Sequence, residues 1–108
     1  MDIYLILRYT ISVPMKLISN KPLREFAALH PDAEVALQAW RRLIERGDFQ
    51  SFAALRETFA AVDKVGSRYV FNIGGNKYRL VASIAFQPRI VWVKAVLTHG
   101  EYDKGTWK

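Results

Sequence analysis

Residues 69–97 read YVFNIGGNKYRLVASIAFQPRIVWVKAVL, and the sheet of the predicted fold follows from them. It holds three runs rich in β-branched and aromatic residues, which favour strands: YVFNI, KYRLVASIAF and IVWVKAVL. The Gly74-Gly75-Asn76 segment joins the first two runs, and these residue types adopt the positive φ angles of a tight hairpin. Gln87-Pro88-Arg89 joins the second pair. The stretch therefore predicts a three-stranded antiparallel meander.

The chain before the meander predicts one short strand and three helices. The strand is expected at 15–19, and the helices at 22–30, from about 32 to 46, and at 51–59. The helices repeat apolar residues at helical spacing, among them Phe26, Trp40, Phe52, Leu55 and Phe59, which we interpret as core. Because such helices must bury their apolar sides, we expect them to cover one face of the meander. The predicted fold is α+β.

Capping residues set the expected helix ends. Asn20, Asp32 and Ser51 are the predicted N-caps, because their side-chain oxygens can accept a hydrogen bond from a free backbone N–H. The first helix is expected to end before Pro31, and the second at Gly47.

The composition fits a single domain, expected at 15–108. The chain has 108 residues and no cysteine, which excludes disulfides and thiolate zinc sites and suits a cytoplasmic protein. His30 and His99 are its two histidines, so a histidine-rich metal site is not expected, and neither is any other cofactor. We interpret His30, in the turn ALHPDA, as structural.

Residues 1–14, MDIYLILRYTISVP, admit two interpretations. The run is shorter than a membrane helix and lacks the features of a signal peptide. Its β-branched residues favour an extra strand. Alternatively, MKLISNKPL from Met15 is the natural start, and residues 1–14 are an over-called extension. The intact mass of the protein made from its own promoter distinguishes the two interpretations. A mass that includes residues 1–14 contradicts the over-called extension.

Positive charge concentrates in the second half of the chain. The net charge is +6 and the pI is about 9.8. Residues 1–59 hold eight basic and seven acidic groups, whereas residues 60–108 hold eight basic and three acidic groups. This asymmetry favours a polyanionic partner, most often nucleic acid, over a merely basic surface.

Hairpin geometry brings several polar residues to one end of the sheet. A turn centred near Gln87-Pro88 puts Arg79 opposite Val96 or Leu97, and Lys77 opposite Thr98 or His99. The segment LTHGEYDK then supplies His99, Tyr102 and Lys104 at that end, whereas Arg68 lies at the other end.

Arg79 is the leading candidate in this group. Strand alternation gives one apolar face, with Tyr78 and Leu80, and puts Lys77 and Arg79 on the other. A cation in an apolar run costs free energy unless it reaches water or a partner, so Arg79 either extends to solvent or binds phosphate. The convergence of polar residues favours a phosphate site.

His99 and Tyr102 each have two interpretations. His99 is either a surface histidine or a general acid or base, since histidine titrates near neutrality. Tyr102 either packs, stacks on a base or shares in proton transfer.

Three segments resemble the HigB toxins of type II toxin–antitoxin modules, which are relatives of RelE. They are MKLISNKPLREFAALHPDA, RYVFNIGGNKYRLVASIAF and LTHGEYDK, and the likeness runs from Met15 to about Lys104. The resemblance implies a RelE-like fold of helices on an antiparallel sheet. It also implies an mRNA interferase that cleaves messenger RNA, commonly on the ribosome, and a HigA-type helix-turn-helix antitoxin that neutralises it and carries it to operator DNA.

The resemblance implies a site as well. Arg79 falls at the position of a phosphate-binding arginine, and His99 and Tyr102 fall in the C-terminal motif. These three are the predicted catalytic residues, and the predicted RNA-binding residues are Lys77, Lys104, Arg68 and Asn76. The expected chemistry is metal-independent attack by the RNA's 2′-hydroxyl, giving a 2′,3′-cyclic phosphate. The alternatives are a protein that binds RNA without cleaving it and an inactive partner of the antitoxin.

Overall fold

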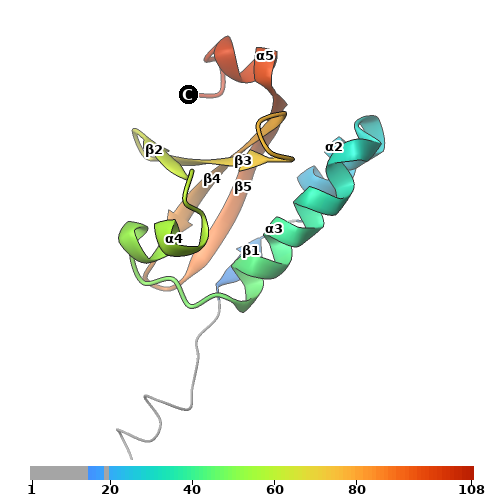
Figure 1. The fold of residues 1–108 in the computed structure, drawn as a ribbon. Coiled ribbons are helices and arrows are strands. Elements are labelled where there is room, and N and C mark those ends of the chain that lie inside the picture. The colour runs from blue at the N-terminus through green and yellow to red at the C-terminus, as the bar shows by residue number, and fades with distance from the viewer. Residues whose placement is uncertain (1–14, 19) are drawn as a thin grey trace, which may run out of the picture.

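The computed structural model describes residues 15–18 and 20–108, so both interpretations of residues 1–14 lie outside the described part (Figure 1). The elements in chain order are β1 (Lys16–Ile18), α2 (Lys21–Leu29), the 3-10 helix η1 (Pro31–Ala33), α3 (Glu34–Arg46), α4 (Phe52–Thr58), β2 (Asp63–Val65), β3 (Arg68–Ile73), β4 (Tyr78–Ala85), β5 (Ile90–Thr98) and α5 (His99–Asp103).

The predicted meander forms the centre of a five-stranded sheet with the order β1-β5-β4-β3-β2. Neighbouring strands are antiparallel except β1, which runs parallel to β5. The strand expected at 15–19 is therefore confirmed as β1. The sequence did not indicate β2, because its three residues, DKV, form no apolar run and are mostly exposed. The α+β prediction is confirmed.

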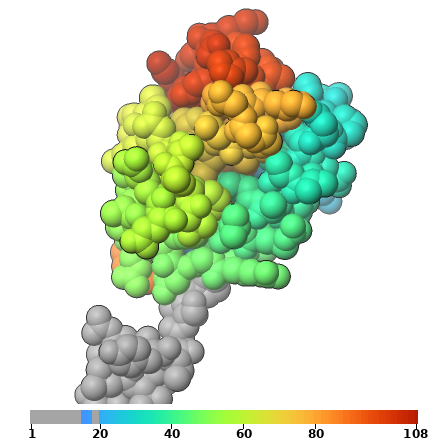
Figure 2. Space-filling model, in the orientation of Figure 1, coloured from blue at the N-terminus to red at the C-terminus, as the bar shows by residue number. Residues whose placement is uncertain are grey.

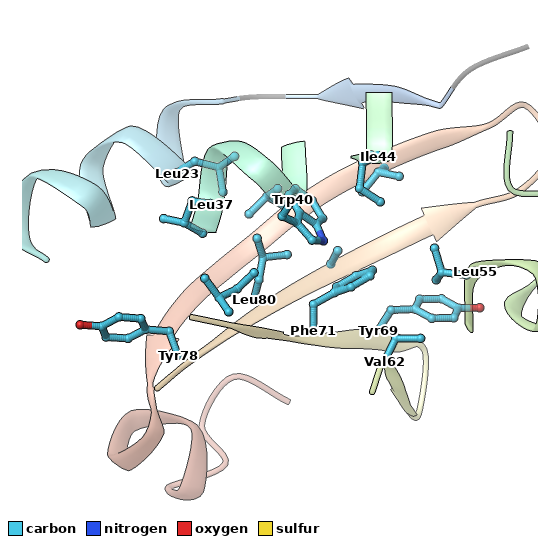
Figure 3. Close-up of a cluster of buried hydrophobic side chains, with 14 of the residues drawn as sticks. Leu23, Leu37, Trp40, Ile44, Leu55, Val62, Tyr69, Phe71, Tyr78 and Leu80 are labelled. Carbon is cyan, nitrogen blue, oxygen red and sulfur yellow. The ribbon is translucent and has the colours of Figure 1, made fainter. Parts of the chain in front are cut away.

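Helices α2, α3 and α4 pack on one face of the sheet, and the apolar core lies between the two layers (Figures 1 and 3). Alternate residues of β3 and β4 face these helices, as predicted, and Trp40 of α3 packs edge-on against Phe71 of β3 at 5.3 Å between ring centroids. The buried helix residues include Leu23, Leu37, Ile44 and Leu55. Among the described residues, no helix is long and apolar enough to cross a membrane.

The opposite face of the sheet, which we call the second face, carries the intervening residues of the strands. On β3 and β4 these are Arg68, Val70, Asn72, Arg79, Val81 and Ser83. The second face therefore holds the arginine that the sequence singled out.

One of the three predicted N-caps is confirmed by its hydrogen bond. The Ser51 hydroxyl accepts from the Ala54 N–H at 3.1 Å, at the start of α4. Asn20 occupies the N-cap position of α2 but makes no capping bond with its side chain. The prediction for Asp32 was wrong, because this residue lies inside η1, and α3 begins only at Glu34. Gly47 ends α3, as expected.

Candidate active site

The β4–β5 register selects one of the two predicted alternatives. Tyr78 pairs with Thr98, and Arg79 pairs with Leu97. A bulge between Val81 and Ala82 shifts the pairing farther along. The register therefore places Arg79, the second residue of β4, beside the end of β5, where the chain continues into α5.

The turn between β3 and β4 holds the guanidinium of Arg79. Its Nη1 donates to the carbonyl oxygens of Asn76 and Tyr78, each at 3.2 Å, and its Nη2 donates to the Asn76 side-chain oxygen at 2.9 Å. The turn can present these oxygens because Gly74 and Gly75 adopt φ angles of +62° and +69°, which few other residues tolerate. Arg79 is thus fixed in place, with only 9% of its surface exposed.

These partners of Arg79 are all neutral oxygens. Three of its five N–H donors are used in the hydrogen bonds seen among the described residues, and the remaining two are on Nε and Nη2. A guanidinium in this state is oriented but keeps its positive charge, which suits it to a phosphate group.

Tyr102 of α5 covers Arg79. The guanidinium carbon lies 5.6 Å from the centre of the Tyr102 ring, within the range of a cation–π interaction. Figure 2 shows the C-terminal segment, in red, packed against the orange segment that contains the β3–β4 turn. The predicted convergence of Arg79 and Tyr102 is therefore found in the structure.

A capping box fixes the start of α5. The Thr98 hydroxyl accepts from the Glu101 N–H at 3.2 Å, and the Glu101 carboxylate accepts from the Thr98 N–H at 2.9 Å. The hydrogen bonds from Thr98 lower the pKa of the Glu101 carboxyl below its ordinary value of 4.5. Because a five-residue helix has little stability of its own, this box determines where His99 and Tyr102 lie.

His99 forms a pair with Asp103 on the exposed side of α5. Its Nδ1 lies 3.0 Å from the Asp103 carboxylate, and 51% of the His99 side chain is exposed. Residues three apart are neighbours on a helix surface, so His99 lies beside Tyr102. The carboxylate engages Nδ1 and leaves Nε2 facing away from it.

Lys77 does not join Arg79, contrary to the predicted alternation. Its Nζ lies 3.1 Å from the Asp32 carboxylate, which also accepts from the Tyr78 hydroxyl at 2.7 Å. Lys77 lies in the turn before β4, where the alternation of a strand does not apply. The hydrogen bond from Tyr78, followed by that from Lys77, lowers the pKa of Asp32, while the Asp32 carboxylate raises the pKa of Tyr78.

The other predicted RNA-binding residues are spread over the molecule. Arg68 lies at the far end of the second face, where its guanidinium donates to the Ser83 hydroxyl. Lys104 is the exposed C-cap of α5. Asn76 acts on Arg79 through both its backbone and its side chain. His30, as predicted, is packed, since its ring stacks on Phe26 at 4.4 Å.

Two residues of this region were not singled out from the sequence. Asp103 could have been recognised by its spacing, since an acid four residues after a histidine faces it on a helix. Trp107 stacks on Tyr102 with ring centroids 4.8 Å apart, and only its place in the C-terminal segment connects it to the site. Across the described residues, no three His, Cys, Asp or Glu side chains converge as a metal site would require.

Comparison with known proteins shows the family to which the chain belongs. The HigB_toxin family model, described as a RelE-like toxic component of a toxin–antitoxin system, matches residues 33–105. The chain is 35% identical to the mRNA interferase toxin HigB of Escherichia coli K12, over 82% of this chain and 88% of that relative. It is 36% identical to mRNA interferase HigB of Escherichia coli O6:H1, over 85% and 92%, and 35% identical to mRNA interferase HigB of Shigella flexneri, over 82% and 88%.

Proposed function

This chain belongs to the HigB toxin family, the RelE-like toxic component of a toxin–antitoxin system, and from this premise we propose that it is an endoribonuclease that cleaves messenger RNA. The observation that carries the proposal is the fixed guanidinium of Arg79, with Tyr102 over it and His99 on the same helix. These groups supply a phosphate-binding cation, an aromatic ring and a proton donor or acceptor.

Arg79 stabilises the charge that develops on the scissile phosphate. In the reaction, the 2′-hydroxyl oxygen forms a bond to phosphorus while the bond from phosphorus to the 5′-oxygen breaks, and negative charge grows on the non-bridging oxygens. The Asn76 and Tyr78 oxygens already orient the guanidinium, so little reorganisation accompanies the reaction. The Nε and Nη2 donors are the groups that we assign to the phosphate.

His99 carries the proton transfer. A histidine whose Nδ1–H donates to Asp103 is held as the tautomer with an acceptor at Nε2. Nε2 therefore either removes the 2′-hydroxyl proton or, in protonated form, donates to the leaving 5′-oxygen, and solvent water exchanges the other proton. The products are a 2′,3′-cyclic phosphate and a 5′-hydroxyl.

The remaining site residues bind the RNA around this centre. Tyr102 stacks on or orients a nucleotide, or shares the proton transfer. Lys104 and Arg68 are assigned to the RNA backbone as exposed or half-buried cations. Asn76 acts mainly by holding Arg79, and Lys77 contributes only long-range attraction while Asp32 neutralises it.

We further propose the setting in which this activity operates. The toxin acts in the cytoplasm on messenger RNA bound to the ribosome. A HigA-type helix-turn-helix antitoxin neutralises it and is its only link to operator DNA. Family membership supports an antitoxin partner, and the excess of basic groups in residues 60–108 supports a polyanionic substrate.

The test is primer extension on ribosome-bound messenger RNA, with analysis of the new RNA ends. We expect discrete breaks that leave a 2′,3′-cyclic phosphate, and no break where a single 2′-deoxynucleotide replaces the nucleotide at the cleavage position. A free 3′-hydroxyl product contradicts the mechanism. No breaks on ribosomes or on free RNA contradicts the nuclease and favours a protein that only binds RNA or the antitoxin.

A further inference from the structure

The C-terminal segment folds back onto the site and brings Trp107 to it. The indole Nε1 donates to the Tyr102 carbonyl at 2.8 Å, and the Gly105 N–H donates to the same carbonyl at 3.0 Å. Gly105 makes the reversal with a φ of +73°, a conformation that favours glycine. These two hydrogen bonds hold Trp107 against α5. Trp107 lies beyond residues 33–105, which match the family model.

Four side chains form one column at this position. The Tyr102 and Trp107 rings are nearly parallel, at 14° and 4.8 Å between centroids. The Arg79 guanidinium carbon lies 5.6 Å from the Tyr102 ring centre, and Lys108 Nζ lies 5.8 Å from the Trp107 ring centre. No cation fits between two stacked rings at that separation, so each cation lies on an outer face of the pair.

The order of the column is therefore Arg79, Tyr102, Trp107, Lys108. The inner end is the buried, fixed cation of the proposed cleavage centre. The outer end is a half-buried indole, and the ammonium group of the exposed Lys108 lies over its outer face. The indole face is thus available to any planar group that can displace that ammonium.

We propose that Trp107 is a second nucleotide-binding subsite, which stacks on the base of a nucleotide adjacent to the one cleaved at Arg79. Lys108 moves from the indole face to the phosphate of that nucleotide when the base binds. This inference rests on the proposed function. An aromatic face beside a cation is the arrangement that binds single-stranded nucleic acid with little dependence on sequence, because every base has a π face.

The test uses a short RNA with 2′-O-methyl groups, which the proposed reaction cannot cleave, and a second copy in which the flanking nucleotide lacks its base. Binding of the full chain is measured by titration and by tryptophan fluorescence. We expect the intact RNA to quench the native protein, and Trp107→Ala to weaken its binding roughly tenfold, as the loss of one stacked base predicts. Trp107→Phe keeps a ring and most of the affinity.

Two controls separate stacking from a supporting role. If Trp107 stacks on the base, native protein and Trp107→Ala should bind the RNA that lacks this base equally tightly. If Trp107 only supports Tyr102, Trp107→Ala should bind both RNAs more weakly than the native protein does. Trp40→Phe should keep the quenching, because Trp40 is buried against Phe71 on the helix side of the sheet. Thermal unfolding of each variant checks that the fold is kept.

The outcomes distinguish this inference from the proposed function. Equal binding of the intact RNA by native protein and Trp107→Ala, or no binding by the native protein, overturns the subsite. Base-dependent binding through Trp107 by a protein that never cleaves unmodified RNA supports the subsite and contradicts the nuclease. Cleavage of unmodified RNA at the same rate by native protein and Trp107→Ala supports the nuclease and contradicts the subsite.

Discussion

Lys77 and Arg79 are cations two residues apart at the same end of β4, yet the structure uses them in opposite ways. Lys77 lies in the turn and pairs with the Asp32 carboxylate on the side of the helices. Arg79 lies in the strand, and its side chain is on the second face of the sheet. Neutral oxygens of Asn76 and Tyr78 hold its guanidinium. One charge is neutralised within the fold and the other is not.

A structural cation and a functional one can be distinguished by the partners that hold them. A carboxylate partner neutralises a charge, and it ties two parts of the fold together, here η1 and the start of β4. Neutral oxygens fix the direction of a guanidinium without removing its charge, which leaves it ready for an anion from outside the protein.

Arg79→Ala should lower the cleavage rate by about 10²- to 10³-fold, because it removes the oriented donor that stabilises the transition state. Arg79→Lys should recover only part of the loss, since lysine keeps the charge but not the planar fork. The rate is measured on ribosome-bound messenger RNA. Arg24→Ala is the matched control, because it removes an exposed cation of α2 on the helix side. An equal loss in both variants would mean that only total charge matters.

His99→Gln should lower the rate by about 10²-fold, the usual contribution of a general acid or base. Asp103→Asn should have a smaller effect, because it removes the partner of Nδ1 but leaves the imidazole in place. His30→Gln is the control, since His30 stacks on Phe26 on the helix side of the sheet and reaches α5 only through its charge on Glu101. If His99→Gln cleaves as fast as the native protein, the proton transfer must be assigned to another group.

Thr98→Ala should lower the rate roughly tenfold, less than the 100-fold that a displaced catalytic group can cost. The substitution removes the cap of α5, at a cost of about 1 kcal/mol in stability, and so loosens His99 and Tyr102 together. Thr98→Ser keeps a capping hydroxyl and should behave as the native protein does. Urea unfolding and cleavage are measured side by side, and a stable variant with an unchanged rate would show that α5 does not depend on its cap.

Asp32→Asn should change the cleavage rate by less than about twofold, since the partners of Asp32 are Lys77 and the Tyr78 hydroxyl and not Arg79. It should, however, change how stability depends on pH. The Tyr78 and Lys77 contacts lower the pKa of Asp32 in the folded protein. Its contribution is therefore complete above the ordinary value of 3.8 and is lost as the pH falls through the lower folded value.

The measurement is the urea midpoint of native protein and Asp32→Asn at several pH values. The gap between them should be full near neutrality and should narrow below pH 3.8. Asp63→Asn, in the exposed strand β2, should leave the native curve unchanged. A gap that widens in acid would mean that the carboxylate is not stabilised by these partners.

The sequence predicted those parts of the fold that have strong local signals. The meander, the apolar face of β4 and the Ser51 cap follow from residue type and spacing, and all three are found. The role of Asp32 could not be predicted, because its partners, Lys77 and Tyr78, are distant in sequence and meet it only after folding. Similarly, β2 has no apolar pattern and forms only because β3 offers it an edge.

For the site, the sequence predicted that Arg79 and Tyr102 meet but not what holds them in place. Strand counting brought Arg79, His99 and Tyr102 to one end of the sheet. It missed the hydrogen bonds from Arg79 to Asn76, because these depend on the exact shape of a glycine turn. It also misplaced Lys77, since a turn residue does not follow the alternation of the strand beside it.

The parallel pairing of β1 with β5 has a consequence for biosynthesis. Lys16 pairs with Ile90, so β1 has no partner until the helices α2 to α4 and the strands β2 to β4 have all been synthesised. Contacts this far apart in sequence form late, because a long loop must close before they repay its entropy. His99 and Tyr102 follow β5 directly, so the region proposed to attack messenger RNA is synthesised only after all five strands of the sheet.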